Sequence, residues 1–256
     1  MSLLSKRILC VPAGRTNLFS TGQAGFIIRS KSGQLFGIDL YLSDCVERVE
    51  GHDGYHRLLP KILSPTELEF DCIVATHPHY DHFDMDSIPQ MMDNPRTRLF
   101  ASVNCQKEVE RLKMLPRNIA YIKPGDKYSV GDFQLRFTSC DHGQGAPDAV
   151  GLLITVDDKR LFFAGDTCLR MDWVDEFLSE GAIDVMAAPI NGAYGNLNEE
   201  ECVQLAAAVN PGMTIPCHFG MFASHGGNSG TFISCMKNHR PSLKYQLLTQ
   251  GEMLTL

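Results

Sequence analysis

The sequence lacks the features that mark several large classes of protein. Its nine cysteines form no C-x-x-C pair, and an odd, scattered set is typical of reduced thiols packed as small apolar side chains. No apolar stretch approaches the ~20 residues that are needed to span a bilayer. The N-terminal residues 1–7 are too short and too weakly apolar to predict a signal peptide. These absences predict a cytoplasmic protein without a membrane partner.

Runs of basic residues are also missing. The formal net charge is −7, and no cluster of Lys and Arg is interleaved with aromatic residues, so a nucleic-acid partner is not expected. A small-molecule substrate is expected, and it can be anionic in spite of the net charge, because the local field in a site matters more than the sum of the charges.

No linker rich in Pro, Gly or Ser divides the 256 residues, and no internal repeat is visible. Strands are expected in both halves, with helices alternating in the later part. The economical interpretation is an α/β fold with two sheets inside and helices outside, in a single domain over residues 1–256.

Hydrophobic periodicity and turn residues predict the individual elements. Strands are expected at 25–30, 35–40, 72–76, 98–103, 121–123, 127–130, 133–139, 150–156, 160–164, 183–188, 213–217, 244–249 and 252–256. Helices are expected at 86–92, 106–114, 172–180, 199–209 and 231–238. Asn198 is the expected N-cap of one helix, and Glu108 is expected to point outward from another. Residues 46–66 are expected to be mostly loop, with a helical turn near 57–63.

Potential metal ligands gather directly after the strand predicted at 72–76. His77, His79, Asp81 and His82 fall within six positions, and Pro78 interrupts the strand between the first two. Burying three imidazoles and a carboxylate is costly unless something binds them. Imidazole with carboxylate, and without thiolate, suits zinc, manganese or iron at a hydrolytic centre. A His-rich surface turn is the alternative, and the density of ligands favours a metal site.

Three more candidate ligands follow predicted strands elsewhere in the chain. His142 comes after 133–139, Asp166 after 160–164 and His218 after 213–217. Loops converge at the C-terminal ends of strands, and sites are usually built there. A lone histidine is more often an ordinary core or surface residue, but together the three complete a ligand set. Asp39 also ends a strand, where it either orients a ligand histidine or caps a loop.

In order and spacing these residues resemble the metallo-β-lactamase superfamily. The resemblance rests on Thr76-His-x-His-x-Asp-His82, followed by His142, Gly165-Asp166 and His218. It covers essentially the whole chain and implies a four-layer αβ/βα sandwich. Within the superfamily the chain is most similar to the L-ascorbate-6-phosphate lactonase group, through residues 75–84, 122–126, 165–166 and 215–218. That similarity also implies a homo-oligomer.

The resemblance implies a role for each ligand. One divalent ion would be held by His77, His79 and His142, a second by Asp81, His82 and His218, with Asp166 bridging them. The lactonase similarity favours Mn²⁺ and the wider superfamily Zn²⁺. Two ions ~3.5–4 Å apart share a water and lower its pKa toward ~7, which gives a hydroxide nucleophile, and Asp81 is close enough to shuttle the proton to the leaving oxygen. The redox branch of the superfamily carries a glutamate in place of His79, which favours hydrolysis here.

Candidate substrate contacts lie in two loops. Asn191 and Tyr194 follow the strand at 183–188, and Tyr194 either donates to an oxyanion or is an ordinary exposed tyrosine. His225 opens the glycine-rich stretch 225–230, which either cradles a phosphate at a helix N-terminus or is a flexible loop with an N-cap. His52, His56 and Arg57 of the insertion at 46–66 are further candidates for the mouth of the site.

The function predicted from the sequence is a metal-dependent hydrolase that opens a lactone of a phosphorylated sugar acid with a metal-bridging hydroxide. A phosphodiesterase or an acyl-homoserine-type lactonase of the same fold is the alternative among enzymes. A catalytically silent metal-binding protein is the alternative outside enzymes.

Overall fold

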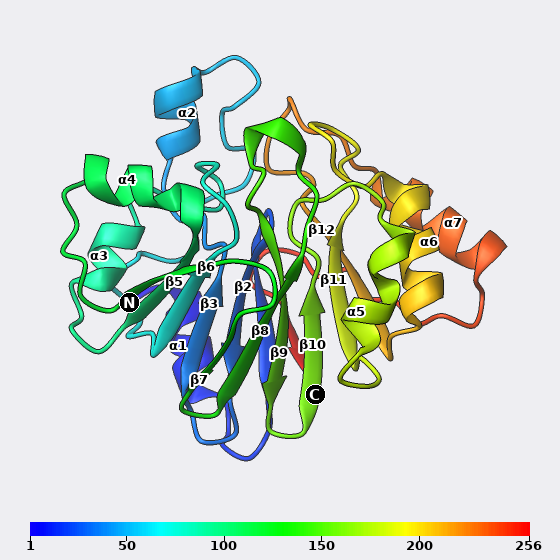
Figure 1. Ribbon diagram of the computed structural model, residues 1–256, viewed down its shortest axis with the longest axis horizontal. Coiled ribbons are helices and arrows are strands. Elements are labelled where there is room, and N and C mark those ends of the chain that lie inside the picture. The colour runs from blue at the N-terminus through cyan, green and yellow to red at the C-terminus, as the bar shows by residue number, and fades with distance from the viewer.

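The computed structural model describes residues 1–256 and contains two sheets that face each other (Figure 1). The first sheet has seven strands in the order β13-β1-β2-β3-β4-β5-β6, and the second has six in the order β12-β11-β10-β9-β8-β7. The strands of the first sheet are β1 (Asn17–Gly22), β2 (Gly25–Arg29), β3 (Leu35–Ile38), β4 (Cys72–Ala75), β5 (Arg98–Ser102), β6 (Ile119–Ile122) and β13 (Met253–Thr255). Those of the second are β7 (Lys127–Val130), β8 (Phe133–Ser139), β9 (Val150–Val156), β10 (Lys159–Phe163), β11 (Val185–Pro189) and β12 (Met213–Cys217).

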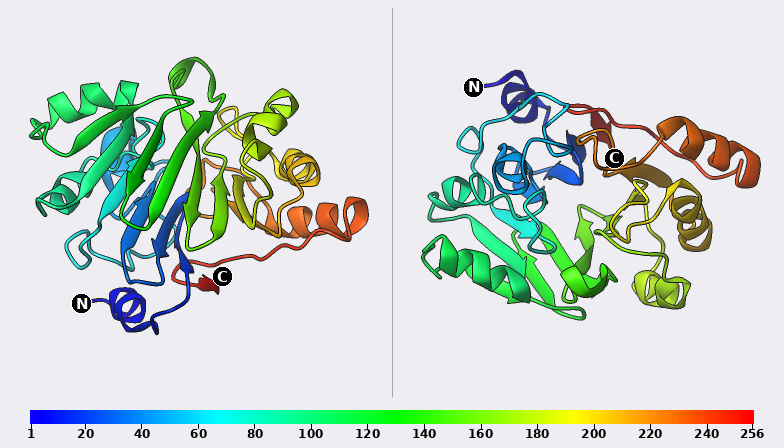
Figure 2. Two further views of the ribbon diagram at one scale, coloured as in Figure 1. Left: turned by 60° about the horizontal axis from the view of Figure 1, so that its bottom comes forward. Right: turned by 90° about the horizontal axis from the view of Figure 1, so that it is seen from above.

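Each sheet has an antiparallel part and a parallel part. In the first sheet β13, β1, β2 and β3 pair antiparallel, while β3, β4, β5 and β6 pair parallel. In the second, β7 to β10 pair antiparallel, while β10, β11 and β12 pair parallel. The C-terminal ends of the parallel strands therefore lie at one edge of the sandwich, where loops from both sheets meet (Figure 2).

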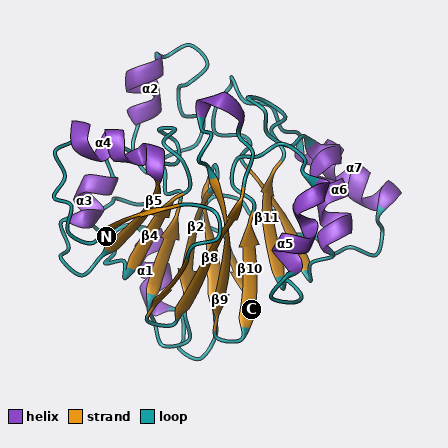
Figure 3. Ribbon diagram, in the orientation of Figure 1, coloured by secondary structure: helices purple, strands orange, loops and turns teal.

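Helices cover the outer faces of the two sheets (Figures 1 and 3). The first sheet carries α1 (Leu3–Cys10), α3 (Ile88–Met92) and α4 (Gln106–Arg111), and the second carries α5 (Val174–Leu178), α6 (Glu199–Val209) and α7 (Ser229–His239). A further short helix, α2 (Cys45–Glu50), stands above the strand ends at the top left of Figure 1. This is the four-layer αβ/βα sandwich that the resemblance implies. None of the helices combines the length and the apolar composition that crossing a bilayer requires.

Alternation along the strands separates the apolar layers of the sandwich. In β9, Leu152 and Ile154 join the core between the sheets, whereas Leu153 points outward to the helices over the second sheet. In β4, Val74 faces the core between the sheets and Ile73 faces the helices over the first sheet. Apolar residues at consecutive positions place apolar side chains on both faces of a strand, and such a strand needs cover on both sides.

The N-terminal helix α1 was not expected, since the only elements predicted in the first forty residues were strands. The Ser2 hydroxyl accepts the Ser5 N–H at 3.2 Å, so Ser2 caps the N-terminus of α1. Leu4 and Ile8, four residues apart, are both buried against the first sheet. An N-cap and an i, i+4 apolar pair are sufficient for two helical turns when the sheet supplies the packing.

In the insertion at 46–66, the prediction of a helical turn near 57–63 is wrong, and the helix is α2 instead. Arg57 turns inward, and its Nη1 donates to the carbonyl oxygens of Tyr41 and Ser43 at 3.1 and 2.9 Å. Pro60 follows shortly afterwards and cannot supply a helical N–H. Cys45 and Val46 of α2 are buried, which anchors that helix.

The prediction of a strand at 244–249 is also wrong. Only Tyr245 forms a bridge there, to Thr214, so the segment runs along β12 without becoming a strand of the sheet. The prediction for α6 holds in detail: the Asn198 side chain accepts the Glu201 N–H at 3.0 Å, and Asn210 ends the helix with φ of 50°.

Candidate metal centre

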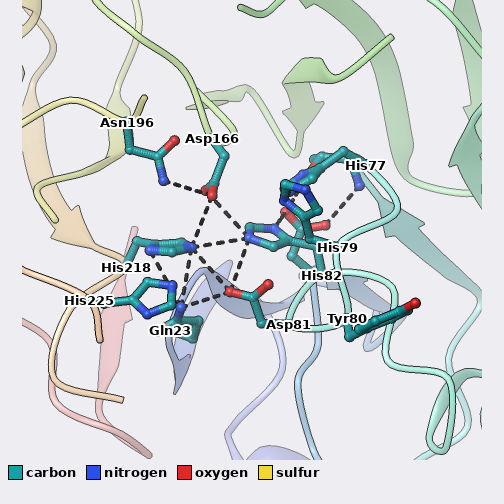
Figure 4. A network of polar contacts seen from close by, with 12 residues as sticks. Gln23, His77, His79, Tyr80, Asp81, His82, Asp166, Asn196, His218 and His225 are labelled. Carbon is teal, nitrogen blue, oxygen red and sulfur yellow. Dashed lines mark hydrogen bonds and ion pairs between the residues drawn. The ribbon is translucent and has the colours of Figure 1, made fainter. Parts of the chain in front are cut away.

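Seven side chains predicted as ligands meet at the edge where the strand ends converge (Figure 4). They come from the loops after β4, β8, β10 and β12, which belong to both sheets. The seven, together called the floor below, are His77, His79, Asp81, His82, His142, Asp166 and His218. All but His79 are buried. The structure thus brings the whole predicted set together.

Three of the histidines form one group of donor atoms. The Nδ1 atom of His79 lies 3.0 Å from Nε2 of His77 and 3.1 Å from Nε2 of His142. A single ring proton on His79 can serve only one of these two contacts. The other is a contact between nitrogen atoms that a cation between the three rings would satisfy.

Asp81, His82 and His218 form a second group beside the first. Nε2 of His218 lies 3.2 Å from Nε2 of His82 and 3.3 Å from Oδ2 of Asp81. Asp166 stands between the groups, with Oδ2 at 3.1 Å from His218 Nε2 and 3.8 Å from His142 Nε2. The two groups and the carboxylate between them have the donor chemistry of a pair of divalent ions.

The polar atoms of the floor fit a metal centre. Oδ1 of Asp166 is buried and has no hydrogen-bond partner. A buried carboxylate oxygen without a partner is expensive, and this one faces His82 Nε2 at 3.4 Å. Nitrogen and oxygen lone pairs that converge in a buried site require cations to offset them. The residues present therefore fit divalent metal ions.

Further polar residues orient the ligands. Oδ2 of Asp39 lies 2.8 Å from Nδ1 of His82, as expected for a partner of a ligand histidine, and it also accepts the Thr76 hydroxyl at 2.7 Å. The same hydroxyl lies 3.1 Å from Nδ1 of His77. Fixing the outer ring nitrogen of a histidine directs the other nitrogen toward the metal.

Two orienting residues were missed by the sequence analysis. Gln23 Nε2 donates to Asp81 Oδ2 at 2.8 Å, and Asn196 Nδ2 donates to Asp166 Oδ2 at 2.7 Å (Figure 4). Gln23 lies in the turn between β1 and β2. Its backbone carbonyl oxygen also accepts the backbone N–H of His218 at 2.8 Å. No spacing rule links these residues to the ligands they hold. The only signal is their position in turns at the same edge of the sheets.

The backbone at the floor takes conformations that few residues favour. Gly165 has φ of 70°, and a Cβ atom there would lie 2.8 Å from the carbonyl oxygen of Val150. His218 and Asp39 have φ of 60° and 45°, which is the left-handed region. Non-glycine residues held there are uncommon, and they occur where surrounding contacts determine the backbone.

Burial and neighbouring charges shift the pKa values of the floor histidines in two directions. Burial lowers the pKa of His77 well below its usual value and that of His142 to about 4, so both rings are neutral. Burial also opposes the charged form of His218, but Asp166 and Asp81 outweigh it and raise its pKa to about 9. Asp166, Asp81 and Asp39 raise the pKa of His82 in the same way. Without metal, the carboxylates therefore hold at least one proton on the His82–His218 pair at neutral pH.

A cavity of about 410 Å³ opens above the floor. The side chains around its opening, called the mouth below, are Glu50, Tyr55, Tyr80, Glu108, Tyr194 and His225. Val46 and Pro78 also line the cavity, and His79, Asp81, His142 and Asp166 form its base. No Lys or Arg is among the lining residues. The expectation that Glu108 points outward is therefore wrong, since it faces this cavity.

Two of the three predicted substrate contacts reach the cavity. Tyr194 is 55% exposed, and its hydroxyl lies 3.1 Å from that of Tyr55 across the mouth. The centre of the His225 ring lies 5.2 Å from the ring centres of Tyr194 and His218. Asn191 is buried instead, donates to the Ala193 carbonyl at 3.4 Å and is not among the lining residues.

The glycine-rich stretch 225–230 packs against the loop after β11. A Cβ atom on Gly226 would lie 2.2 Å from the Asn191 carbonyl oxygen, and one on Gly227 would lie 2.5 Å from Phe219. The N-terminus of α7 is already capped, because the Asn228 side chain accepts the Thr231 N–H at 3.0 Å. Of the two interpretations of this stretch, the N-cap is therefore the one that the contacts support.

The remaining candidates lie away from the cavity. Nδ1 of His52 and of His56 lie 2.6 and 2.8 Å from the two oxygens of Glu47, on the exposed side of α2. Arg57 is buried beneath the Tyr41 ring, with its guanidinium carbon 4.6 Å from the ring centre. None of the three lines the cavity.

Comparison with known proteins agrees with this geometry. A family model described as "Beta-lactamase superfamily domain" matches residues 41–219, a span that includes the whole floor. A relative from Enterococcus faecalis, called a UPF0173 metal-dependent hydrolase, is 29% identical over 182 residues, covering 67% of this chain and 77% of the relative.

Solved structures share the fold at lower identity. Igni18, called a novel metallo hydrolase, from Ignicoccus hospitalis, superposes with a TM-score of 0.73 at 19% identity, covering 95% of this chain and 99% of Igni18. CmlA, called a diiron beta-hydroxylase, from Streptomyces venezuelae, superposes with a TM-score of 0.68 at 16% identity, covering 96% of this chain and 54% of CmlA. These two similarities show only that the fold is shared, because the names of the two proteins describe different reactions.

The family match spans well over half of the chain. The chain therefore belongs to the metallo-β-lactamase superfamily and is a metal-dependent hydrolase of that fold.

Proposed function

We propose that this member of the metallo-β-lactamase superfamily opens the ring of a small lactone by hydrolysis, with a pair of divalent ions, Mn²⁺ or Zn²⁺, on its floor. The observation that carries the proposal is the complete set of seven nitrogen and oxygen ligands at the base of an open cavity. Water adds its oxygen to the carbonyl carbon, the bond from that carbon to the ring oxygen breaks, and the ring oxygen takes a proton. The product is a hydroxy acid.

In this proposal the two groups of donor atoms hold one ion each. His77, His79 and His142 hold the first, and Asp81, His82 and His218 hold the second, with Asp166 between them. When bound, such a pair supplies Lewis acidity that makes water a nucleophile near neutral pH and polarises the carbonyl group. His79, in the place where the redox branch has a glutamate, supports hydrolysis over the oxygen chemistry that the name of CmlA describes.

Asp81 is the residue that moves the proton in this proposal. It lines the cavity, and its Oδ2 accepts the Gln23 amide at 2.8 Å. That hydrogen bond holds one carboxylate oxygen in place and leaves the other free to take a proton from water and to return it to the ring oxygen. Without metal, burial opposes the charged form of Asp81, but the neighbouring histidines outweigh it and keep the pKa of Asp81 low, so the carboxylate is ionised.

Tyr194 and His225 are the proposed substrate contacts at the mouth. The Tyr194 hydroxyl can donate to an oxygen that becomes negative during attack. Asn191 was also predicted to contact the substrate. It does not line the cavity, so the structure gives this prediction no support.

Similarity to the L-ascorbate-6-phosphate lactonase group supports the lactone part of the proposal. The phosphorylated sugar acid has less support, since no cationic side chain lines the cavity and α7 is capped at its N-terminus. The same lack of cations weighs against a phosphodiesterase. An acyl-homoserine-type lactonase is the second candidate, because its uncharged ring needs no cationic contact. The single domain, the homo-oligomer and the cytoplasmic location stay predictions from the sequence.

The proposal is tested on protein purified without chelators. Metal content is measured by mass spectrometry, and ring opening of γ- and δ-lactones is followed by acid release at constant pH. We expect two divalent ions per chain and hydrolysis that stops on chelation and returns with Mn²⁺ or Zn²⁺. Protein that binds metal but hydrolyses no lactone would indicate the silent metal-binding alternative, and hydrolysis of phosphodiesters alone would replace the lactonase.

A further inference from the structure

The mouth and the floor of the cavity differ in the charge that a ligand meets there. The floor is built to hold cations, but the only charged side chains that line the mouth are Glu50 and Glu108. A narrow opening lined by one sign of charge concentrates ligands of the opposite sign. The field at the mouth therefore opposes the entry of anions, whereas the floor attracts the electron-rich oxygen of a carbonyl group.

Glu50 and Glu108 differ in their partners. Glu108, on α4, lies 3.4 Å from Arg111, which reduces its field. Glu50 ends α2, is exposed, and makes no ion pair or hydrogen bond with any other side chain. An unpaired carboxylate beside a binding cavity is available to a ligand, so Glu50 is the charge at the mouth that a substrate meets.

Aromatic rings line the same opening as this carboxylate. Tyr55, Tyr80 and Tyr194 all line the mouth, and the hydroxyl groups of Tyr55 and Tyr194 are 3.1 Å apart. The faces of aromatic rings attract cations, and quaternary ammonium groups are commonly held by such rings. The tyrosine rings also accept uncharged apolar groups, whereas their negative faces repel an anion and only their hydroxyl groups can donate to one.

We propose that the site selects a small lactone or ester that carries an ammonium group, held at the mouth by Glu50 and the tyrosines while the carbonyl group reaches the floor. This inference rests on the proposed function and names the substrate class. Uncharged substrates rank second and anionic substrates last. Hydrolysis adds a carboxylate to such a substrate and keeps its ammonium group, so the product is a zwitterion.

A matched set of γ-butyrolactones tests the proposal on the metal-bound enzyme. The three compounds carry a trimethylammonium, a tert-butyl or a carboxylate group at the same ring carbon. The first two groups have nearly the same shape and differ in charge. Each kcat/KM is divided by the rate of alkaline hydrolysis of the same compound, which removes the effect of the substituent on the reactivity of the carbonyl group.

We expect the trimethylammonium compound to exceed its tert-butyl analogue about fivefold in normalised kcat/KM, and the carboxylate compound to fall about tenfold below that analogue. Glu50→Gln should reduce the first ratio toward one. Glu200→Gln, which removes the same charge from an exposed position on α6, should leave it unchanged. Preference for the anionic compound, equal rates for all three, or a ratio that Glu50→Gln does not alter would overturn the proposal.

Failure of the proposed function gives a different result. If none of the three lactones is hydrolysed, the lactonase is wrong, and binding of the trimethylammonium and tert-butyl compounds is then compared by titration calorimetry. Tighter binding of the cation by the wild type but not by Glu50→Gln would retain the charge selection for a hydrolase of another bond. Equal binding of the two compounds would reject it.

Discussion

The floor and the mouth of the same cavity are built in different ways. Floor residues follow the ends of strands from both sheets, are largely buried, and are held by side chains such as Asp39, Gln23 and Asn196. Mouth residues come from α2, α4 and four loops, and Tyr194 is 55% exposed. The floor is a fixed part of the fold, whereas the mouth consists of surface attached to it.

This difference separates the chemistry from the choice of substrate. Ligands fixed by buried hydrogen bonds keep the geometry that catalysis needs. Exposed side chains on a short helix and on loops can change without disturbing the core. Changes to the floor should therefore reduce turnover by large factors, and changes to the mouth should alter binding by small ones.

The largest effect is expected for Asp81→Asn. The amide cannot take a proton, so turnover of lactones should fall by about 10²–10⁴-fold. Because Asn is similar in shape and still accepts the Gln23 hydrogen bond, the variant should keep the fold. Steady-state kinetics and metal content are measured together, so that loss of a metal ion can be distinguished from loss of proton transfer.

Asp93→Asn is the matched control, since Asp93 is exposed at the end of α3, away from the cavity. Its turnover should equal that of the wild type. An Asp81→Asn enzyme with full metal content and unchanged turnover would remove Asp81 from proton transfer.

Metal binding is expected to depend strongly on pH. The pKa of His218 is raised to about 9, with Asp166 and Asp81 outweighing burial, and the pKa of His82 is raised as well. A metal ion binds the neutral ring, so it must displace at least one proton at neutral pH. Apparent affinity should therefore rise by up to about tenfold for each pH unit until about pH 9. Titration calorimetry at pH 7 in buffers with different ionisation enthalpies measures the proton release.

Stability of the metal-free protein should change with pH in the opposite direction. The folded pKa of His218 lies above its usual value of 6.5, so protonated His218 stabilises the fold. That contribution is complete below pH 6.5 and is lost as the pH rises through about 9. Thermal unfolding after chelation checks this sign, and metal binding without proton release at pH 7 would contradict the charge assigned to the His82–His218 pair.

A smaller effect is expected for Asp39→Asn. Asp39 binds the outer nitrogen of His82 and the Thr76 hydroxyl, and loss of such a partner typically costs 10–100-fold in metal affinity or activity. Asp71→Asn is the control, because Asp71 accepts the Leu35 N–H at the opposite end of the same strands. Competition with a chromogenic chelator measures both variants. Equal metal affinities would show that Asp39 serves the backbone rather than the metal centre.

The floor could be predicted from the sequence because its chemistry restricts both residue type and position. Metal ligands must be His, Asp, Glu or Cys, and they gather after strands, as His77 and Asp166 do. The four-layer sandwich was implied by the resemblance that the same ligands carry, and the continuous apolar run of β9, with side chains buried on both faces, agrees with it.

Of the mouth only Tyr194 and His225 could be predicted, because no such rule applies to the rest. Glu50 lies in α2, a helix within a segment expected to be loop, and Glu108 faces the cavity from a helix expected to turn it outward. Whether either carboxylate reaches the cavity depends on how α2 and α4 pack above the strand ends. Gln23 is similar, because only the meeting of the β1–β2 turn with β12 brings it to Asp81.

The smallest effect is expected for Tyr55→Phe, which removes one hydroxyl from the mouth. That hydroxyl lies 3.1 Å from the hydroxyl of Tyr194, and a neutral hydrogen bond contributes ~0.5–1.5 kcal/mol. KM should therefore change by about two- to tenfold while kcat is nearly constant, because the ligands of the floor are untouched. Tyr121→Phe, on β6 and outside the cavity, is the control, and its kinetics should match the wild type. A fall in kcat of about 100-fold for Tyr55→Phe, with full metal content, would mean that the mouth takes part in the chemistry and that the two regions are not separate.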